Sequence, residues 1–115
     1  MRHRANRPLP TAVSVVALML VSAVAPAAPP GPPESTRIAI KDFMFTPMKL
    51  TTHVGAVVTW VNQDDEPHTT VSATGLFRSG ALDTDMTYTF KFDKRGTYQV
   101  FCSIHPQMTA TIIVE

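Results

Sequence analysis

The chain of 115 residues contains a single cysteine, Cys102, and this scarcity excludes several kinds of site. One cysteine cannot form an internal disulfide. It cannot supply the C-x-x-C-H motif that attaches haem covalently, nor the several thiolates of a common structural zinc site. Three roles remain for the thiol: burial as a small apolar side chain, a disulfide to another molecule, or ligation of a metal.

The sequence also lacks a hydrophobic run long enough for an ordinary membrane span. The apolar run Thr11–Ala25 has 15 residues between two prolines, whereas a spanning helix needs roughly 20. Three arginines and no acidic residue precede this run, and Ala25-Pro26-Ala27 offers a small-x-small cleavage site, which is the pattern of a secretory signal peptide. We therefore expect a signal peptide over residues 1–27, with an uncleaved N-terminal anchor as the alternative. Both a cleaved signal peptide and an uncleaved anchor predict an exported domain that is periplasmic or otherwise extracytoplasmic.

The chain has no excess of Lys and Arg over Asp and Glu once the predicted signal peptide is left out of the count. Residues 28–115 contain seven Lys and Arg against nine Asp and Glu, which gives a net charge of −2. Composition therefore gives no support to nucleic-acid binding. Export also bears on Cys102, because a bare thiol is a liability in an oxidising compartment, so metal ligation becomes the favoured role.

The pattern of residues 36–115 indicates an all-β domain, since no apolar period of 3.6 residues occurs in it. Val57–Val61 is apolar on both faces, as in a central strand. We predict a β-sandwich or barrel, preceded by an extended Pro-rich leader over residues 28–35. The runs in which apolar and polar residues alternate with a period of two are Met48–Val54, Thr87–Phe92 and Ala110–Val114.

A loop near the C-terminus contains the chemically most distinctive residues. Cys102 is followed at intervals of three residues by His105 and Met108, and alternation along Thr97–Cys102 turns the thiol toward the core. A further histidine, His68, opens another predicted strand. Strict alternation there would turn its side chain outward, but Pro67 favours a break in the chain, so the alternative is that His68 precedes the regular strand or lies at a bulge. Thiolate, imidazole and thioether together suit copper, because soft sulfur favours Cu(I) and imidazole accommodates both oxidation states. A trigonal His₂Cys site with a weak axial methionine is the blue-copper arrangement.

Each of these residues has a simpler role when considered alone, as a buried cysteine, a solvated turn histidine or a methionine that fills the core. The combination of all four favours copper over zinc, which rarely uses methionine. A Cys–His hydrolase is disfavoured because Cys102 and His105 share one short loop without a nearby Asn or Asp to orient the imidazole. A copper enzyme would need more histidines than His53, which is the only other one after residue 27. We therefore expect no catalysis.

Several stretches together resemble a small bacterial cupredoxin of the plastocyanin/amicyanin type, over essentially the whole predicted domain. The resemblance implies a cupredoxin-like Greek-key β-sandwich with one type 1 copper ion. His68, Cys102 and His105 would be its strong equatorial ligands. Met108 would be the long axial ligand, and Asn62 would tie the His-bearing loop to the Cys-bearing loop. The stretches are Phe43-x-Phe45-x-Pro47-x-x-Leu50, Val58-Thr-Trp-Val-Asn62, Pro67-His68-Thr69, and Gly96-Thr-Tyr98 leading to Cys102-x-x-His105-Pro106-x-Met108.

By this resemblance the chain is an exported type 1 (blue) copper protein that carries single electrons between redox partner proteins. Partners would bind transiently near His105, the ligand expected nearest the solvent, and we expect a monomer without a membrane span in the mature chain. A copper-trafficking or storage protein is the alternative. Met44 and Met48 offer it further thioethers, although their strand-like context indicates the core. The acidic run Asp64–Glu66 is interpreted as a solvated turn or, alternatively, as charge that steers a basic partner.

Overall fold

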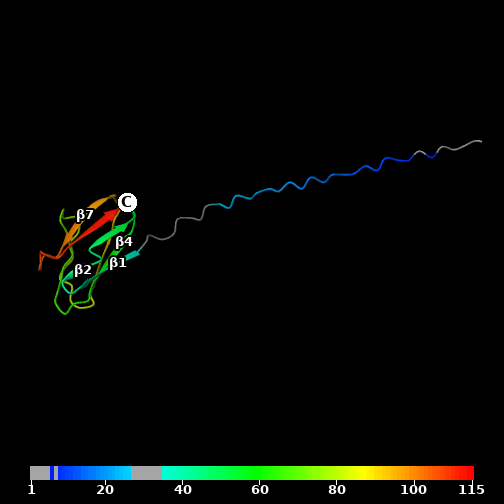
Figure 1. The fold of residues 1–115 in the computed structure, drawn as a ribbon. Helices are drawn as coiled ribbons and strands as arrows, with labels where there is room; N and C mark the ends of the chain where they lie inside the picture. The colour runs from blue at the N-terminus through cyan, green and yellow to red at the C-terminus, as the bar shows by residue number, and fades with distance from the viewer. Residues whose placement is uncertain (1–5, 7, 27–34) are drawn as a thin grey trace, which may run out of the picture.

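A computed structural model describes residues 6, 8–26 and 35–115, and the folded region that it describes consists of strands, turns and loops (Figure 1). The strands in chain order are β1 (Ser35–Lys41), β2 (Met44–Thr46), β3 (Lys49–Thr52), β4 (Val57–Asn62), β5 (Val71–Ser72), β6 (Thr87–Lys91), β7 (Gly96–Phe101) and β8 (Thr109–Val114).

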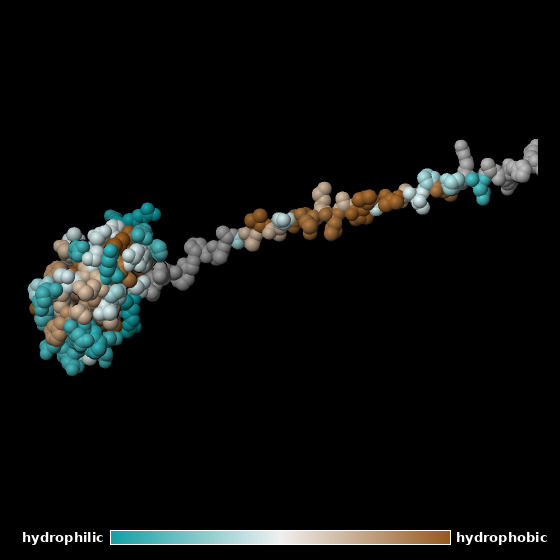
Figure 2. All heavy atoms as spheres, in the orientation of Figure 1, coloured by the Kyte–Doolittle hydropathy of each residue, from teal (hydrophilic) through white to brown (hydrophobic). Residues whose placement is uncertain are grey.

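The N-terminal segment of residues 8–26 is extended and has no regular secondary structure. Its apolar side chains are exposed, and they form the brown stretch of Figure 2. Within the described parts of the chain, no helix is long and apolar enough to cross a membrane. The predicted cut after Ala27 lies outside the described residues. So does the predicted leader of residues 28–35, except for Ser35, which begins β1.

The eight strands form two four-stranded sheets, with the orders β2-β1-β4-β6 and β3-β8-β7-β5. Each sheet is mixed: β1 is parallel to β4 in the first sheet, β3 is parallel to β8 in the second, and the remaining pairs are antiparallel. This arrangement confirms the all-β fold class. It also confirms the central position predicted for Val57–Val61, since β4 lies between β1 and β6.

The hydrophobic core combines inward-facing residues of both sheets. Trp60 of β4 is fully buried from the first sheet, and Val100 of β7 and Ile112 of β8 are buried from the second. The alternation predicted for Thr87–Phe92 and Ala110–Val114 is confirmed, because every second residue is the less exposed one: Tyr88, Phe90 and Phe92 in the first run, and Ala110, Ile112 and Val114 in the second. Burial of these side chains supplies the main driving force for packing the two sheets.

The alternation predicted over Met48–Val54 is only partly confirmed. The regular strand β3 covers four residues, and within it Leu50 is half-buried and Thr52 is buried. Val54 is 47% exposed because it lies in the turn after the strand, where the chain no longer follows the pleat. The core-facing part of this run is therefore shorter than the sequence pattern indicated.

The expectation that Met44 and Met48 lie in the core is wrong. Their side chains are 50% and 56% exposed. Met44 is on the three-residue strand β2, where Phe45 takes the inward position and its neighbours face outward. Met48 lies in the bend between β2 and β3, where its carbonyl accepts a hydrogen bond from the Thr111 amide.

Three connections come together at one end of the sandwich. Strand β5 pairs with β7 so that Val71 lies opposite Phe101, and the residues just before Val71 therefore lie beside Cys102. The β1–β2 turn joins the same end through hydrogen bonds to Asp64. The three connections are the turn Asp42–Phe43, the β4–β5 connection of residues 63–70, and the β7–β8 loop Cys102–Met108.

Candidate metal centre

Cys102 follows directly after the last residue of β7 and is fully buried. Val100 precedes it on the inward face of the strand, so the predicted direction of the thiol is confirmed. Two backbone hydrogen bonds close the loop that follows. The Met108 amide donates to the carbonyl of His105 at 2.9 Å, and the Cys102 amide donates to the carbonyl of Met108 at 3.1 Å. Met108 is buried, and the loop returns it to the neighbourhood of Cys102.

His68 lies in the connection that precedes β5 and is also fully buried. Its amide donates to the carbonyl of Leu82 at 3.1 Å, and the Leu82 amide donates back to the carbonyl of His68 at 2.7 Å. His68 precedes the regular strand β5, which was one of the two expected alternatives, so the outward direction of strict alternation does not apply to it. The reciprocal hydrogen bonds fix the backbone of His68, and its ring points into the site.

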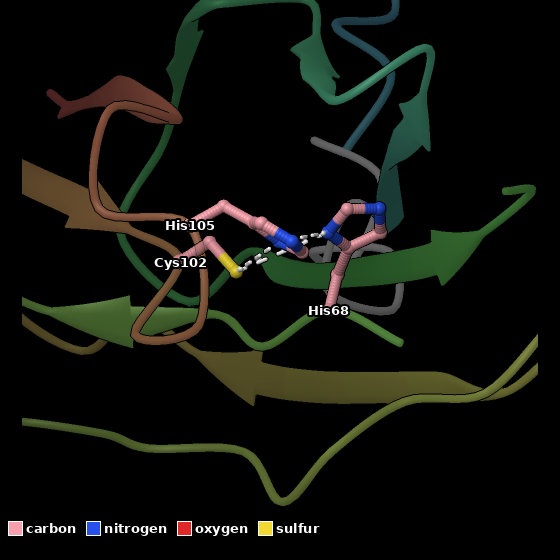
Figure 3. A group of neighbouring side chains, drawn as sticks. All are labelled: His68, Cys102 and His105. Atoms are coloured by element: carbon pink, nitrogen blue, oxygen red, sulfur yellow. Dashed lines mark hydrogen bonds between the residues drawn. The ribbon is translucent and has the colours of Figure 1, made fainter. Parts of the chain in front are cut away.

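The side chains of His68, Cys102 and His105 converge at the end of the sandwich (Figure 3). The two Nδ1 atoms lie 3.1 Å apart, and the Cys102 Sγ lies 3.9 Å from Nδ1 of His68 and 3.8 Å from Nδ1 of His105. A metal bonded to nitrogen at about 2.0 Å and to sulfur at about 2.3 Å in a trigonal plane would separate the nitrogens by about 3.5 Å. It would separate each nitrogen from the sulfur by about 3.8 Å. The two nitrogen–sulfur edges match these separations and the nitrogen–nitrogen edge is about 0.4 Å shorter, so the triangle is close to the size that a three-coordinate metal requires.

Phe43 covers the two imidazoles from the β1–β2 turn. Asp42 and Phe43 have φ angles of 52° and 58°, the left-handed conformation that a two-residue type I′ hairpin turn demands at both positions. The Phe43 ring meets the His68 ring edge-on at a centroid distance of 5.1 Å and the His105 ring at 5.0 Å. A bulky residue in this conformation is uncommon, and here it places an apolar ring over the site.

Asp64 is buried, at 9% exposure, so the interpretation of the acidic run as a solvated turn is wrong for this residue and holds only for residues 65–66. Its carboxylate accepts hydrogen bonds from the amides of Asp42 at 2.7 Å and Phe43 at 2.9 Å, and its Oδ2 lies 2.9 Å from Nε2 of His68. Burial alone would raise the pKa of Asp64, but the two amides and the imidazole outweigh burial and lower the pKa below its usual value. The group is therefore an ionised carboxylate at neutral pH.

The link between the His-bearing and Cys-bearing loops that was expected of Asn62 is made by Thr69 instead. The Asn62 side chain donates to the carbonyl of Glu66 in the β4–β5 connection and to that of Leu82 in the β5–β6 connection, both at 2.8 Å. Thr69 makes the link to the Cys loop. Its hydroxyl accepts from the Ser103 amide at 2.7 Å and lies 2.8 Å from the Ser103 hydroxyl, and its amide donates to the Cys102 sulfur at 3.4 Å.

Three neighbours of the site were not predicted from the sequence: Phe43, Asp64 and Thr69. Thr69 had an available signal, because a hydroxyl residue directly after a candidate ligand can hydrogen-bond to the opposite loop. Phe43 was noted only as part of a family pattern. Asp64 had no usable signal, because its contact with His68 depends on the path of an irregular connection.

A β-sandwich that gathers two imidazole nitrogens and one cysteine sulfur at one end, with a buried methionine in the same loop, defines a protein that binds a single copper ion. Comparison with known families agrees with this class. The model of the cupredoxin-like domain matches residues 11–114, and the chain belongs to that family.

Similar proteins come from several organisms. Amicyanin-alpha of Methylorubrum extorquens is 31% identical over 94 residues, which are 73% of this chain and 75% of that protein. A plastocyanin of Scenedesmus fuscus is 34% identical over 85 residues, which are 63% of this chain and 87% of that protein. The solved structure of a purple cupredoxin from Nitrosopumilus maritimus has a TM-score of 0.65 at 30% identity, covering 70% of this chain and 99% of that one. The resemblance to small cupredoxins of the plastocyanin/amicyanin type is confirmed.

Proposed function

We propose that this chain is an exported type 1 copper protein that carries single electrons between redox partner proteins. His68, Cys102 and His105 would be the equatorial ligands, and Met108 would be the axial ligand. The observation that carries the proposal is the buried triangle of two Nδ1 atoms and one Sγ atom, with edges of 3.1, 3.8 and 3.9 Å. When bound there, copper supplies a one-electron couple between its cuprous and cupric states.

The protein contributes a fixed and largely dry set of donor atoms. Cys102 and His68 are fully buried and Met108 is nearly so. Backbone hydrogen bonds at both ends of the loop and on both sides of His68 limit how far these groups can move. A site that keeps nearly one geometry in both oxidation states needs little reorganisation when an electron arrives or leaves. This property suits a carrier.

His105 is the route by which the electron would enter and leave. It is the ligand that is partly exposed, and the neighbouring Ile104 is 46% exposed. Pro106 is exposed beside it, so the imidazole edge lies within an apolar rim. Small and weakly held interfaces are typical of redox partners that must separate after each transfer. The similarity to amicyanins and to a plastocyanin supports a carrier rather than an enzyme.

Copper loading followed by visible and EPR spectroscopy tests this function directly. We expect one intensely blue copper per chain, reversibly reduced without release of the metal. The variant Cys102→Ser should lose the blue absorption completely, because a type 1 copper site requires a cysteine thiolate as ligand and Cys102 is the only cysteine of the chain. His53→Ala is the matched control, since His53 is exposed and outside the metal site, and it should remain blue. A colourless wild-type protein that binds copper would overturn the proposal.

Copper trafficking is the second candidate, and one observation favours it. Met44 and Met48 are half-exposed, so their thioethers are accessible to cuprous ions at the surface. A competition experiment with a Cu(I) chelator separates the two functions. A carrier should retain Cu(I) when the chelator is in excess, and a trafficking protein should transfer it within minutes.

Export and the domain boundaries complete the proposal: a signal peptide over residues 1–27, a leader over residues 28–35, and the copper domain over residues 36–115. The apolar side chains of residues 8–26 are exposed, for example Leu20 at 90%, so removal of this segment would cost the domain no core contacts. Intact-mass measurement of the protein recovered from the periplasm tests the boundary. The expected mature chain begins at residue 28, and a full-length membrane-bound chain would indicate an anchor.

A further inference from the structure

Asp64 differs from the other acidic residues of the domain because every one of its polar atoms has a partner. Its amide donates to Oδ1 of Asn62 at 2.9 Å, and its carbonyl accepts from the Thr84 hydroxyl at 2.7 Å. Its carboxylate accepts from the two amides of the β1–β2 turn, and Oδ2 also lies 2.9 Å from Nε2 of His68. This bonding pattern holds the carboxylate in one position and aims it at the imidazole.

The chemistry of these contacts fixes the proton on His68. Both carboxylate oxygens of Asp64 already accept hydrogen bonds from backbone amides, so the carboxylate acts as the acceptor toward His68 too, and Nε2 of His68 carries the hydrogen that lies between them. Nδ1 of the same ring is then free of hydrogen and faces the triangle of donor atoms. A metal-binding histidine whose other nitrogen donates to a carboxylate is held in the correct tautomer and is a more basic ligand.

We propose that Asp64 is a positioning residue for the copper site, which acts through the Nε2–H of His68 to orient the imidazole and to lower the reduction potential of the bound copper. This inference rests on the proposed copper-binding function. The negative charge, transmitted through the polarised imidazole, stabilises the cupric ion more than the cuprous ion because the cupric ion has the higher charge. Loss of the carboxylate should therefore weaken Cu(II) binding more than Cu(I) binding.

The same carboxylate couples the β1–β2 turn to the site. Its hydrogen bonds to the amides of Asp42 and Phe43 hold two residues with positive φ, and successive amides in such a turn form a concave site for an anion. Phe43 thereby keeps its ring edge-on over both histidines. One buried carboxylate thus fixes both the ligand and its apolar cover.

The decisive experiment compares Asp64→Asn with Asp65→Asn in the copper-loaded protein. Each variant removes one negative charge from adjacent positions, but Asp65 is exposed, and in the described region no hydrogen bond or ion pair joins its side chain to the site. Substitution of a residue that hydrogen-bonds to a metal ligand commonly reduces metal affinity by about 10–100-fold. For Asp64→Asn we expect Cu(II) affinity to fall about tenfold relative to Cu(I), which raises the midpoint potential by about 59 mV for a one-electron couple. For Asp65→Asn we expect a much smaller shift. Equal shifts of the midpoint potential in the two variants would overturn the proposal.

A second measurement needs no substitution and decides the matter if Asp64→Asn does not fold. In the reduced Cu(I) protein, which is diamagnetic, NMR should show the Nε2–H of His68 as a sharp resonance that exchanges slowly with water. The Nε2–H of the partly exposed His105 is the internal reference and should exchange faster. Fast exchange at His68 would overturn the inference. A wild-type protein without blue copper would instead count against the proposed function, so the two failures are distinguishable.

Discussion

The two histidines of the site belong to regions of opposite character. His68 is fully buried, its backbone is bonded in both directions to Leu82, and its ring is tied to Asp64. His105 is partly exposed on the Cys102–Met108 loop, and its ring touches Phe43. For the proposed electron carrier we infer from this difference that the two regions have separate roles. The His68 region would set the geometry and electrostatics of the metal, and the His105 region would face the partner.

Replacement of either histidine by glycine should abolish the blue absorption, but added imidazole should restore it in only one of the two variants. His68→Gly and His105→Gly should both lose the blue absorption, because each removes an equatorial ligand. Added imidazole should restore the colour in His105→Gly, since its cavity opens toward solvent. It should not restore the colour in His68→Gly, whose cavity is enclosed by protein. Absorption spectra during imidazole titration provide the measurement, and equal recovery in the two variants would contradict the separate roles of the two regions.

The rigidity attributed to the buried region can be tested at Thr69. Thr69→Val removes the hydroxyl that accepts from the Ser103 amide, and we expect the free energy of unfolding to fall by about 1–3 kcal/mol because a part-buried amide loses its partner. Thr70→Val is the matched control. The Thr70 hydroxyl is buried and, in the part of the chain that the structure describes, has no hydrogen-bond partner, so its removal should be neutral or slightly stabilising. Urea unfolding of the two variants gives the comparison, and similar losses would show that the Thr69 hydroxyl has no special role.

The sequence was sufficient to predict the fold class and the residues that converge on the site. Alternation with a period of two identified the main strands, because a sheet with one buried face imposes that period on its residues. Residue type, the three-residue spacing of the Cys loop and the resemblance to cupredoxins together identified His68, Cys102 and His105, because thiolate, imidazole and thioether groups suit copper. Met44 was misplaced because it takes an outward position on β2, where Phe45 faces inward, and Met48 was misplaced because it lies in the bend between β2 and β3.

The surroundings of the metal site were not predictable, for a physical reason. Asp64 contacts the turn residues 42–43 across about twenty positions of chain. That contact exists only after β1 and β4 have paired in parallel register. Neither strand alternation nor ligand spacing encodes the path of the β4–β5 connection. The groups that surround the proposed ligands, such as Asp64, are therefore visible only in the folded structure, even where the candidate ligands themselves are evident from the sequence.

The exposed region can be tested by placing a charge on its rim. Ile104→Lys puts a lysine beside His105 on a side chain that is 46% exposed, while Val54→Lys makes the same change at a position that is 47% exposed. Val54 is the matched control because its amide donates to the carbonyl of Glu115, beyond the end of β8 that is distant from the Cys loop.

Electron self-exchange between oxidised and reduced copies of the protein measures the effect without a natural partner. When two copies meet through their His105 faces, the two introduced lysines repel each other and lose hydration, so we expect the rate for Ile104→Lys to fall by about tenfold. Val54→Lys should leave the rate nearly unchanged, and neither variant should change the blue absorption. The loss should diminish at high ionic strength, because salt screens the repulsion. NMR line widths in mixtures of the two oxidation states report this rate. An equal decrease of the self-exchange rate in both variants would mean that electrons do not leave through His105. The His68 and His105 regions would then differ in burial but not in function.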